Sequence, residues 1–388
     1  MVQRLLVVVT GLLLPSLPVT ALAPTTTSGP GELGTSWNAR AVDAELGDMQ
    51  RAGLTWVRTG FQFAWRGQAT SYQWIDSVVG RATARHLNMI LAVFGKPRND
   101  LGSNADREAY KSWLKEMVHR YKSRVRVWEV GNEPNIQEYW NIRGNPGDAS
   151  WNDGVRRYAQ HLGDTYEVIK AEDPTATVLL GGLSQYHAVE FFDRLIGERV
   201  QGRPSYRFFD AMNLHPYGDT PDDVVAEVRA MQRRMAAVPG VAGKDLWITE
   251  FGWQTSWKRH HRYVASEEIK AQYLVESIRK LRAIGIRTPI LIYTWRDDGF
   301  TGEDVADGSG FGLTTNRPGT VYLPAFHALQ RLIRQGQSRS PGPPQPGRSP
   351  STGRMAAGLG MAAAGLSVVL LGVRYMYVRR RRGSSQDR

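Results

Sequence analysis

The chain has 388 residues, no cysteine and a formal net charge of +12. The charge is concentrated at the ends: residues 1–23 contribute +1 and residues 336–388 contribute +8, which leaves +3 for the body. We therefore expect no nucleic-acid binding, which needs a basic stripe on a folded face. Without disulfides or thiol chemistry, stability must come from a large core, which a body of about 310 residues can supply.

Residues 1–23 are predicted to be a secretory signal peptide. Arg4 precedes the apolar run "LLVVVTGLLL", and small residues follow near Ala21, after which we expect cleavage. The alternative, an uncleaved anchor, is less favoured because the apolar run is too short to cross a bilayer.

The C-terminal region is predicted to anchor the chain in a membrane. Residues 336–354 are rich in Pro, Gly and Ser and predict an extended stalk. Residues 355–378 predict a transmembrane helix, because 355–373 carry no charge, and 379–388 predict a basic cytoplasmic tail. The stalk holds "SPSTG", which is similar to a sortase signal of the LPxTG type, but Ser349 replaces the expected Leu. We therefore expect a permanent single-pass anchor in the cell membrane, with the body extracytoplasmic.

Residues 24–335 are predicted to form one domain of alternating strands and helices. Eight apolar, β-branched runs predict strands: 33–37, 54–61, 88–94, 125–131, 177–183, 208–217, 245–253 and 288–295. Stretches with helical periodicity lie between or after them: 72–86, 106–123, 189–200, 221–237, 266–285 and 323–335. Eight such units in about 300 residues predict the α/β class and a (β/α)8 TIM barrel. A doubly wound open sheet is the alternative, but no Gly-rich phosphate turn follows the first strand.

Polar and aromatic residues follow the predicted strands, where the active face of a barrel lies. They are Arg58, Trp65, Asn132, Glu133, His215, Tyr217, Glu250, Trp253 and Trp295. Glu133 and Glu250 follow the fourth and seventh strands, so a barrel brings both to one rim. Two facing carboxylates are what glycosidic bond cleavage needs, because one protonates the leaving oxygen while the other attacks or stabilises the sugar. This chemistry requires no cofactor.

The motifs "WEVGNEPN", "NLHPY", "WITEFGW" and "YTW" resemble the strand ends of clan A glycoside hydrolases. The first is most similar to glycoside hydrolase family 39 and its polysaccharide-cleaving relatives. The resemblance covers the body, about 33–335. It implies that Glu133 is the general acid/base, that Glu250 is the nucleophile of a retaining double displacement, and that Asn132 binds the 2-hydroxyl of the sugar. It also implies that Tyr217 or His215 orients Glu250 and that Trp295 forms the floor under the sugar.

Two roles are open for Arg58. Its charge, aimed at the barrel mouth, would keep Glu250 ionised, or it would instead pair with Glu129, which shares the strand face of Glu133 four residues earlier. The negative charge of Glu250 would favour the protonated form of Glu133 until the covalent bond removes that charge.

Six Trp residues lie on loops after strands and could stack on sugar rings: Trp65, Trp140, Trp151, Trp253, Trp257 and Trp295. The alternative is that each packs against the barrel, and only Trp253 and Trp295 favour sugar binding over packing. His260 and His261 in "KRHHRY" lack the spacing of a metal site, so an exposed basic loop is favoured.

The predicted function is a glycosidase that hydrolyses β-linked O-glycosidic bonds inside an extracellular or cell-envelope polysaccharide. One alternative is a catalytically silent carbohydrate-binding surface module. Another is an exo-acting β-glycosidase or a transglycosylase, which uses the same two acids. The sequence indicates neither the sugar nor the oligomeric state.

Overall fold

The computed structural model describes residues 32–36, 42–63, 72–95, 103–256, 264–297, 310–315 and 321–338. The chain divides into two units, Met1–Ser340 and Pro341–Arg388, and the described residues belong to the first. The predicted signal peptide, stalk, transmembrane helix and tail lie outside them, as do Trp65, Trp257, His260 and His261. Over the described ranges, no helix combines the length and apolar character needed to cross a membrane.

Eight parallel strands of the described chain form the barrel wall. They are β1 (Leu33–Ser36), β2 (Trp56–Gln62), β3 (Asn88–Phe94), β4 (Val127–Val130), β5 (Thr177–Leu180), β9 (Met212–His215), β10 (Leu246–Ile248) and β11 (Ile290–Ile292). The first and last strands pair, and the gap between β5 and β9 is closed by a bridge between Leu179 and Ala211. The Leu180 N–H donates to Ala211 O at 3.1 Å across the same seam. The predicted TIM-barrel fold is therefore confirmed.

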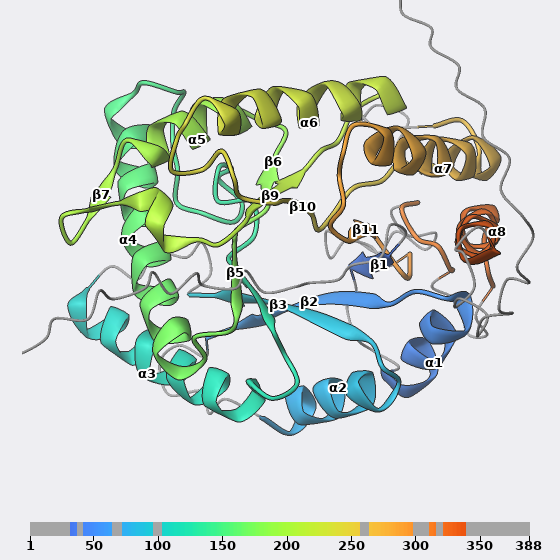
Figure 1. Ribbon diagram of the computed structural model, residues 1–388, viewed down its shortest axis with the longest axis horizontal. Coiled ribbons are helices and arrows are strands. Elements are labelled where there is room, and N and C mark those ends of the chain that lie inside the picture. Colours follow the sequence, from blue (N-terminus) through green and yellow to red (C-terminus); the bar gives the residue numbers. More distant parts are fainter. Residues whose placement is uncertain are drawn as a thin grey trace, which may run out of the picture. The chain divides into compact units, whose positions relative to one another are not determined.

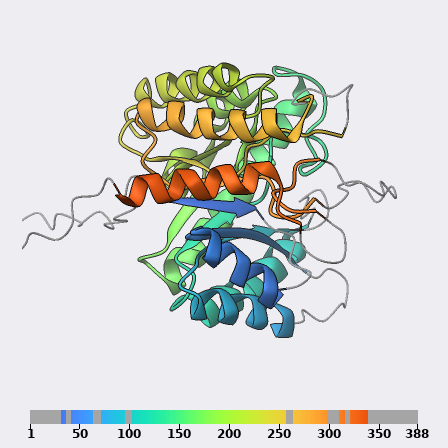
Figure 2. The same cartoon turned by 90° about the vertical axis from the view of Figure 1, so that its right-hand side faces the viewer.

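Helices surround the strands (Figure 1). They are α1 (Val42–Ala52), α2 (Tyr72–Ala84), α3 (Asn104–Tyr121), α4 (Ala149–Glu172), α5 (Ala188–Ile196), α6 (Pro221–Ala236), α7 (Glu267–Ala283) and α8 (Pro324–Ser338). Figure 2 shows α7 and α8 running side by side. Side-chain caps fix several starts: Ser103, Thr220 and Ser266 accept backbone N–H groups of α3, α6 and α7.

Two apolar cores explain the pattern of strands buried on both faces. The smaller lies inside the barrel, and seven strands or their flanking residues contribute to it: Trp56, Ile90, Val127, Leu179, Ala211, Trp247 and Leu291. The larger core packs the outer faces of the strands against the helices. Most of the wall is therefore apolar on both sides, and the partly exposed acids Glu133 and Glu250 lie just beyond the strand ends.

The predicted fifth strand, 177–183, is broken in two. Strand β5 ends at Leu180, and β6 (Leu183–Ser184) pairs separately with β9. Gly182 lies between them because a Cβ there would meet the His215 ring at 2.0 Å. The break lets His215 point into the barrel mouth. Strands β7 (Arg199–Val200) and β8 (Arg203–Pro204) form a separate antiparallel hairpin, followed by a 3-10 helix at Ser205–Phe208.

Candidate active site

Glu133 and Glu250 lie at one end of the barrel, just beyond the C-terminal ends of β4 and β10. One carboxylate oxygen of each, together with a ring nitrogen of His215, all lie within 4.8 Å of one another. The side chains of the two acids are 9% and 12% exposed, so both keep some access to solvent. The two acids, predicted to share one rim, therefore lie together there.

Glu133 has a left-handed backbone, with a φ of 39°. Such a conformation is uncommon outside glycine and persists where neighbouring contacts enforce it, often at functional sites. Here the Glu133 N–H donates to Gly182 O at 3.0 Å, and the Ile136 N–H donates to Glu133 O at 3.1 Å. The turn directs the carboxyl group from the strand end toward the barrel mouth.

Two neighbours hold the Glu250 carboxylate. The Tyr217 hydroxyl donates to Oε1 at 2.6 Å, and Arg58 Nη1 donates to Oε2 at 3.2 Å. Each oxygen therefore accepts a hydrogen bond, one of them from a positive charge.

Arg58 contacts both of its predicted partners. Besides Glu250, it binds Glu129 through two hydrogen bonds, from Nε at 2.6 Å and from Nη2 at 2.8 Å. Nη2 also donates to Oδ1 of Asn132 at 2.7 Å. Burial alone would lower the pKa of Arg58, but the surrounding carboxylates, first of all Glu129, raise it above its usual range. The guanidinium is thus a fixed positive charge beneath the site.

His215 contacts the other acid. Its Nδ1 lies 3.2 Å from Oε1 of Glu133 and 4.0 Å from Oε2 of Glu250. Its Nε2 lies 3.0 Å from the hydroxyl of Thr249. Of the two candidates for orienting Glu250, Tyr217 makes the direct hydrogen bond, whereas His215 lies at hydrogen-bond distance from Glu133.

The predicted sugar-binding roles of Trp253 and Trp295 are contradicted by their burial. Trp253 is 0% exposed and packs edge-on against Phe251 and Tyr273. Trp295 is 1% exposed and packs edge-on against Phe326. A sugar needs an open ring face for stacking, and neither indole offers one.

Trp140 and Trp151 are also buried, which confirms the packing alternative for these two loop residues. Of the six Trp residues considered, the four that lie in the described part of the chain all pack against the barrel or its helices. They therefore form no aromatic surface for a sugar chain.

Three aromatic residues near the acids were not among the predicted site residues, although one of them, Tyr293, lies in the strand-end motif "YTW". Tyr139 is half-buried, and the pKa of its hydroxyl is raised by burial and then by the charges of Glu133 and Glu250. Phe311 and Tyr293 are half-buried as well, with ring centroids 5.3 Å apart. Phe311 also meets the ring of Tyr217 edge-on at 6.2 Å.

A buried lysine holds the segment that carries Phe311. Lys270 of α7 is 0% exposed, and its Nζ donates to Gly310 O at 2.8 Å and to Gly312 O at 2.9 Å. The Gly310 N–H donates to Asp297 at 2.7 Å. Burial lowers the pKa of Lys270, and the neighbouring Glu267 opposes this shift. These contacts fix both peptide groups beside the Phe311 ring.

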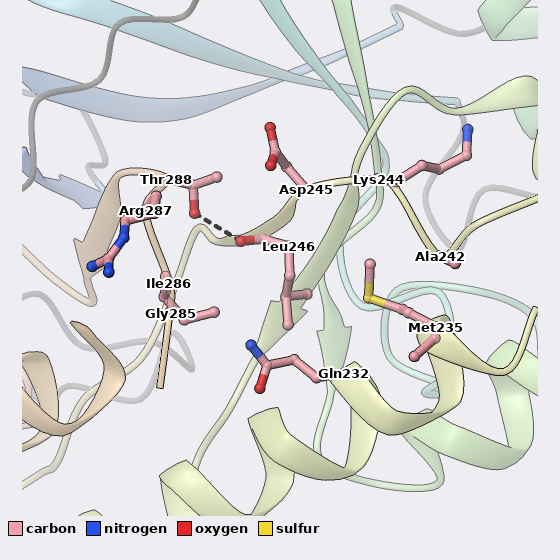
Figure 3. A pocket seen from close by; sticks show the side chains of 11 residues that line it. Gln232, Met235, Ala242, Lys244, Asp245, Leu246, Gly285, Ile286, Arg287 and Thr288 are labelled. Atoms are coloured by element: carbon pink, nitrogen blue, oxygen red, sulfur yellow. Dashed lines mark hydrogen bonds between the residues drawn. The ribbon is translucent and has the colours of Figure 1, made fainter. Parts of the chain in front are cut away.

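A cavity of about 270 Å³ lies elsewhere, between α6 and the starts of β10 and β11. Figure 3 shows its lining, including the hydrogen bond of 2.7 Å from the Thr288 hydroxyl to Leu246 O. Asp245 and Thr288 precede their strands, whereas Glu250 follows β10. The cavity therefore opens at the opposite end of the barrel from the two acids and has no part in their chemistry.

Glu133, His215 and Glu250 are the described residues whose atoms could together hold a metal ion. The guanidinium of Arg58 already bonds to Glu250, and its charge would repel an added cation. The same three groups can act without a metal, as an acid, its polar partner and a nucleophile.

Residues 33–295 match the family described as Cellulase (glycosyl hydrolase family 5). The chain belongs to this family. The expected relation to clan A glycoside hydrolases is thereby confirmed, and so is the expected class of enzyme, a glycosidase. No curated protein matches the chain.

Solved structures with the same fold include a family 39 glycoside hydrolase from Bacteroides cellulosilyticus, with a TM-score of 0.60 and 16% identity. The match covers 79% of this chain and 64% of that one, which is just under two thirds of its length. Virulence factor SghA from Agrobacterium tumefaciens, solved also with the substrate analogue salicin, has a TM-score of 0.57 and 14% identity, over 75% of this chain and 85% of that one. A broad-specificity endoglucanase from Clostridium longisporum has a TM-score of 0.53 and 13% identity, over 79% and 96%. At these identities the likeness establishes the fold alone.

Proposed function

We propose that this family 5 glycosidase is a retaining enzyme in which Glu250 is the nucleophile and Glu133 the general acid/base. The observation that carries the proposal is the approach of the two carboxylates within 4.8 Å. Retaining glycosidases hold their acids roughly 5 to 5.5 Å apart, whereas inverting enzymes leave about 6.5 to 9.5 Å for a water molecule. The short separation favours direct attack by a carboxylate.

The two acids would exchange roles between the two steps. In the first step the ionised Glu250 attacks the anomeric carbon while Glu133 gives its proton to the leaving oxygen, so that the glycosidic bond breaks and a glycosyl ester forms. In the second step Glu133 accepts a proton from water, and the resulting hydroxide displaces Glu250. Because Arg58 donates to Oδ1 of Asn132, the amide nitrogen of Asn132 remains as the donor for the sugar 2-hydroxyl.

The family and the site support a proposal for the substrate class. The family name is Cellulase and one similar structure is an endoglucanase, so we propose a β-linked polysaccharide cut at internal bonds. With Trp253 and Trp295 buried, we assign the sugar contact on the nucleophile side to Phe311, which meets the ring of Tyr217, and to Tyr293 beside it. The predicted signal peptide and anchor would place the body outside the cell membrane. Protease added to intact cells tests this: it should digest the body and leave residues 379–388 uncut.

Alanine substitution of each acid tests the roles. Glu250→Ala should lose several orders of magnitude in kcat on every substrate, because no covalent intermediate can form. Glu133→Ala should lose as much on natural polysaccharide but far less on an aryl glycoside whose leaving group needs no proton. Glu172→Ala, at the end of α4, is the control and should keep full activity. A variant of either acid with near-native turnover on polysaccharide would remove that residue from the mechanism.

A further inference from the structure

Behind Glu133 lies a row of three side chains that have no exposed surface. Asn213, Thr249 and His215 are each 0% exposed. The Thr249 hydroxyl donates to Oδ1 of Asn213 at 3.0 Å, and His215 Nε2 lies 3.0 Å from the same hydroxyl. The other ring nitrogen, Nδ1, meets Oε1 of Glu133 at 3.2 Å. The row thus runs from the barrel interior to the proposed acid/base.

Proton positions along this row follow from what each atom can do. An amide oxygen only accepts, so the single hydroxyl proton of Thr249 is committed to Asn213. The hydroxyl oxygen can then only accept from His215, which requires a proton on Nε2. With the Asn213 amide oriented so that Oδ1 meets the Thr249 hydroxyl, the tautomer of His215 that carries its proton on Nδ1 alone would leave Nε2 facing that hydroxyl oxygen without a proton.

The charges around the ring favour a proton on Nδ1 as well. Three carboxylates have an oxygen within 4.0 Å of a ring nitrogen: Glu133 at 3.2 Å, Glu129 at 3.9 Å and Glu250 at 4.0 Å. Arg58 bonds to two of these acids, Glu129 and Glu250, and opposes the added charge. Burial favours the neutral ring, but a doubly protonated ring would find an oxygen acceptor at each nitrogen.

We propose that Asn213 and Thr249 are positioning residues that hold His215 as an imidazolium throughout the catalytic cycle. The Nδ1–H of this imidazolium donates to Oε1 of Glu133, so the catalytic proton of Glu133 resides on Oε2. This inference rests on the proposed role of Glu133 as the acid/base.

The proposal keeps the buried charges balanced in both steps. In the free enzyme Glu133 is protonated, and the negative charges of Glu129 and Glu250 are balanced by the positive charges of Arg58 and His215. After Glu250 becomes an ester and Glu133 has given its proton to the leaving group, Glu129 and Glu133 are matched by the same two cations. A neutral His215 would leave one uncompensated negative charge in each state, and in the glycosyl-enzyme its Nδ1 lone pair would face the ionised Glu133 carboxylate directly.

Nitrogen-15 NMR of the histidine rings in the full chain tests the charge state without any substrate. His215, assigned by comparison with His215→Asn, should show both ring nitrogens protonated from pH 5 to 8. A ring with one unprotonated nitrogen at neutral pH would overturn the proposal. Because this readout does not involve catalysis, its failure would leave the assignment of Glu133 and Glu250 standing.

The kinetics of two variants, one without and one with the side-chain hydroxyl, test the role of Thr249. Thr249→Val removes the acceptor of Nε2, and Thr249→Ser keeps it. On aryl β-cellobiosides, kcat/KM of the Val variant should fall about 10- to 100-fold for 4-nitrophenol or poorer leaving groups but less than about 3-fold for 2,4-dinitrophenol, which needs little protonation. The Ser variant should stay within about 3-fold of wild type on both. Equal losses on both leaving groups, or no loss on either, would show that Thr249 does not act through the proton of Glu133.

Discussion

The hydroxyl of Tyr217 donates a 2.6 Å hydrogen bond to Oε1 of Glu250. This contact joins the loop after β9 to the loop after β10, so the proposed nucleophile is held from a neighbouring strand. Arg58 reaches the other carboxylate oxygen from β2 at 3.2 Å. With both oxygens restrained, the orientation of the attacking group is fixed before substrate binds.

Tyr217→Phe should lower kcat/KM by about 10- to 100-fold, because a hydrogen bond to a charged group contributes roughly 1.5 to 3 kcal/mol. Tyr110→Phe is the matched control: it removes a buried hydroxyl that bonds Thr165 outside the barrel at 3.1 Å. The control should affect stability and leave kcat/KM unchanged; equal kinetic losses in the two variants would contradict the role of Tyr217.

Arg58→Lys should reduce turnover by more than about 100-fold, because a single ammonium cannot replace the several hydrogen bonds of the guanidinium. It should also destabilise the fold by roughly 3 kcal/mol, because it leaves a buried carboxylate without its full partner. The affected acid is Glu129, which is 0% exposed. Arg107→Lys is the control, since Arg107 makes a similar bidentate pair of hydrogen bonds to Asp164, at 2.8 and 3.0 Å, away from the site. Urea unfolding and steady-state kinetics of both variants would separate stability from catalysis. Full activity in Arg58→Lys would count against its contact with Glu250.

Phe311→Ala should raise KM by about 3- to 10-fold on oligosaccharides, the range expected for loss of one aromatic contact. The ring is held against Tyr217 by the two hydrogen bonds from Lys270, so a smaller decrease in kcat should accompany the change. Phe311→Leu keeps bulk without an aromatic face and should restore kcat but not KM. An unchanged KM in both variants would exclude Phe311 from the sugar site.

Lowering the pH should destabilise the body through His161, which is buried between the rings of Tyr110 and Trp140. Burial lowers its pKa from 6.5 to about 4. Below pH 6.5 the unfolded chain binds a proton on this ring that the folded chain does not bind until about pH 4, so the free energy of unfolding falls as pH decreases through this window. The loss amounts to roughly 3 kcal/mol across the whole window.

His161→Leu should remove most of this acid sensitivity, which urea midpoints at pH 7 and pH 4.5 would measure. His119→Leu is the control, because that side chain is 72% exposed. If the two variants lose the same stability on acidification, His161 is not the group responsible.

The barrel and its two acids were predictable because they depend on local pattern and topology. Each predicted strand lies where a barrel strand lies, and parallel strands place their C-terminal ends at one rim whatever the loops do. Glu133 and Glu250 could therefore be paired across 117 residues of sequence. The break between β5 and β6 was not predictable, since it depends on the His215 ring, which approaches Gly182 from another strand.

Side-chain contacts of the site were harder to predict than its location. A Trp after a strand can turn into the mouth or back against the helices with the same backbone, and Trp253 turns toward Tyr273 of α7. Phe311 lies on a return segment after β11 with no periodic signal, and only the carbonyl contacts of Lys270 reveal how it is held. For Arg58 both predicted contacts form, because a guanidinium has enough donors for Glu129 and Glu250 together.

The covalent step is tested most directly by trapping it. The full chain is incubated with the 2-deoxy-2-fluoroglycosyl fluoride that matches its best polysaccharide substrate, and intact mass and peptide mapping then locate the adduct. We expect one glycosyl group per chain, bound as an ester to Glu250, and no labelling of Glu250→Ala. Turnover of the fluorosugar without an adduct, or an adduct on any other residue, would contradict it.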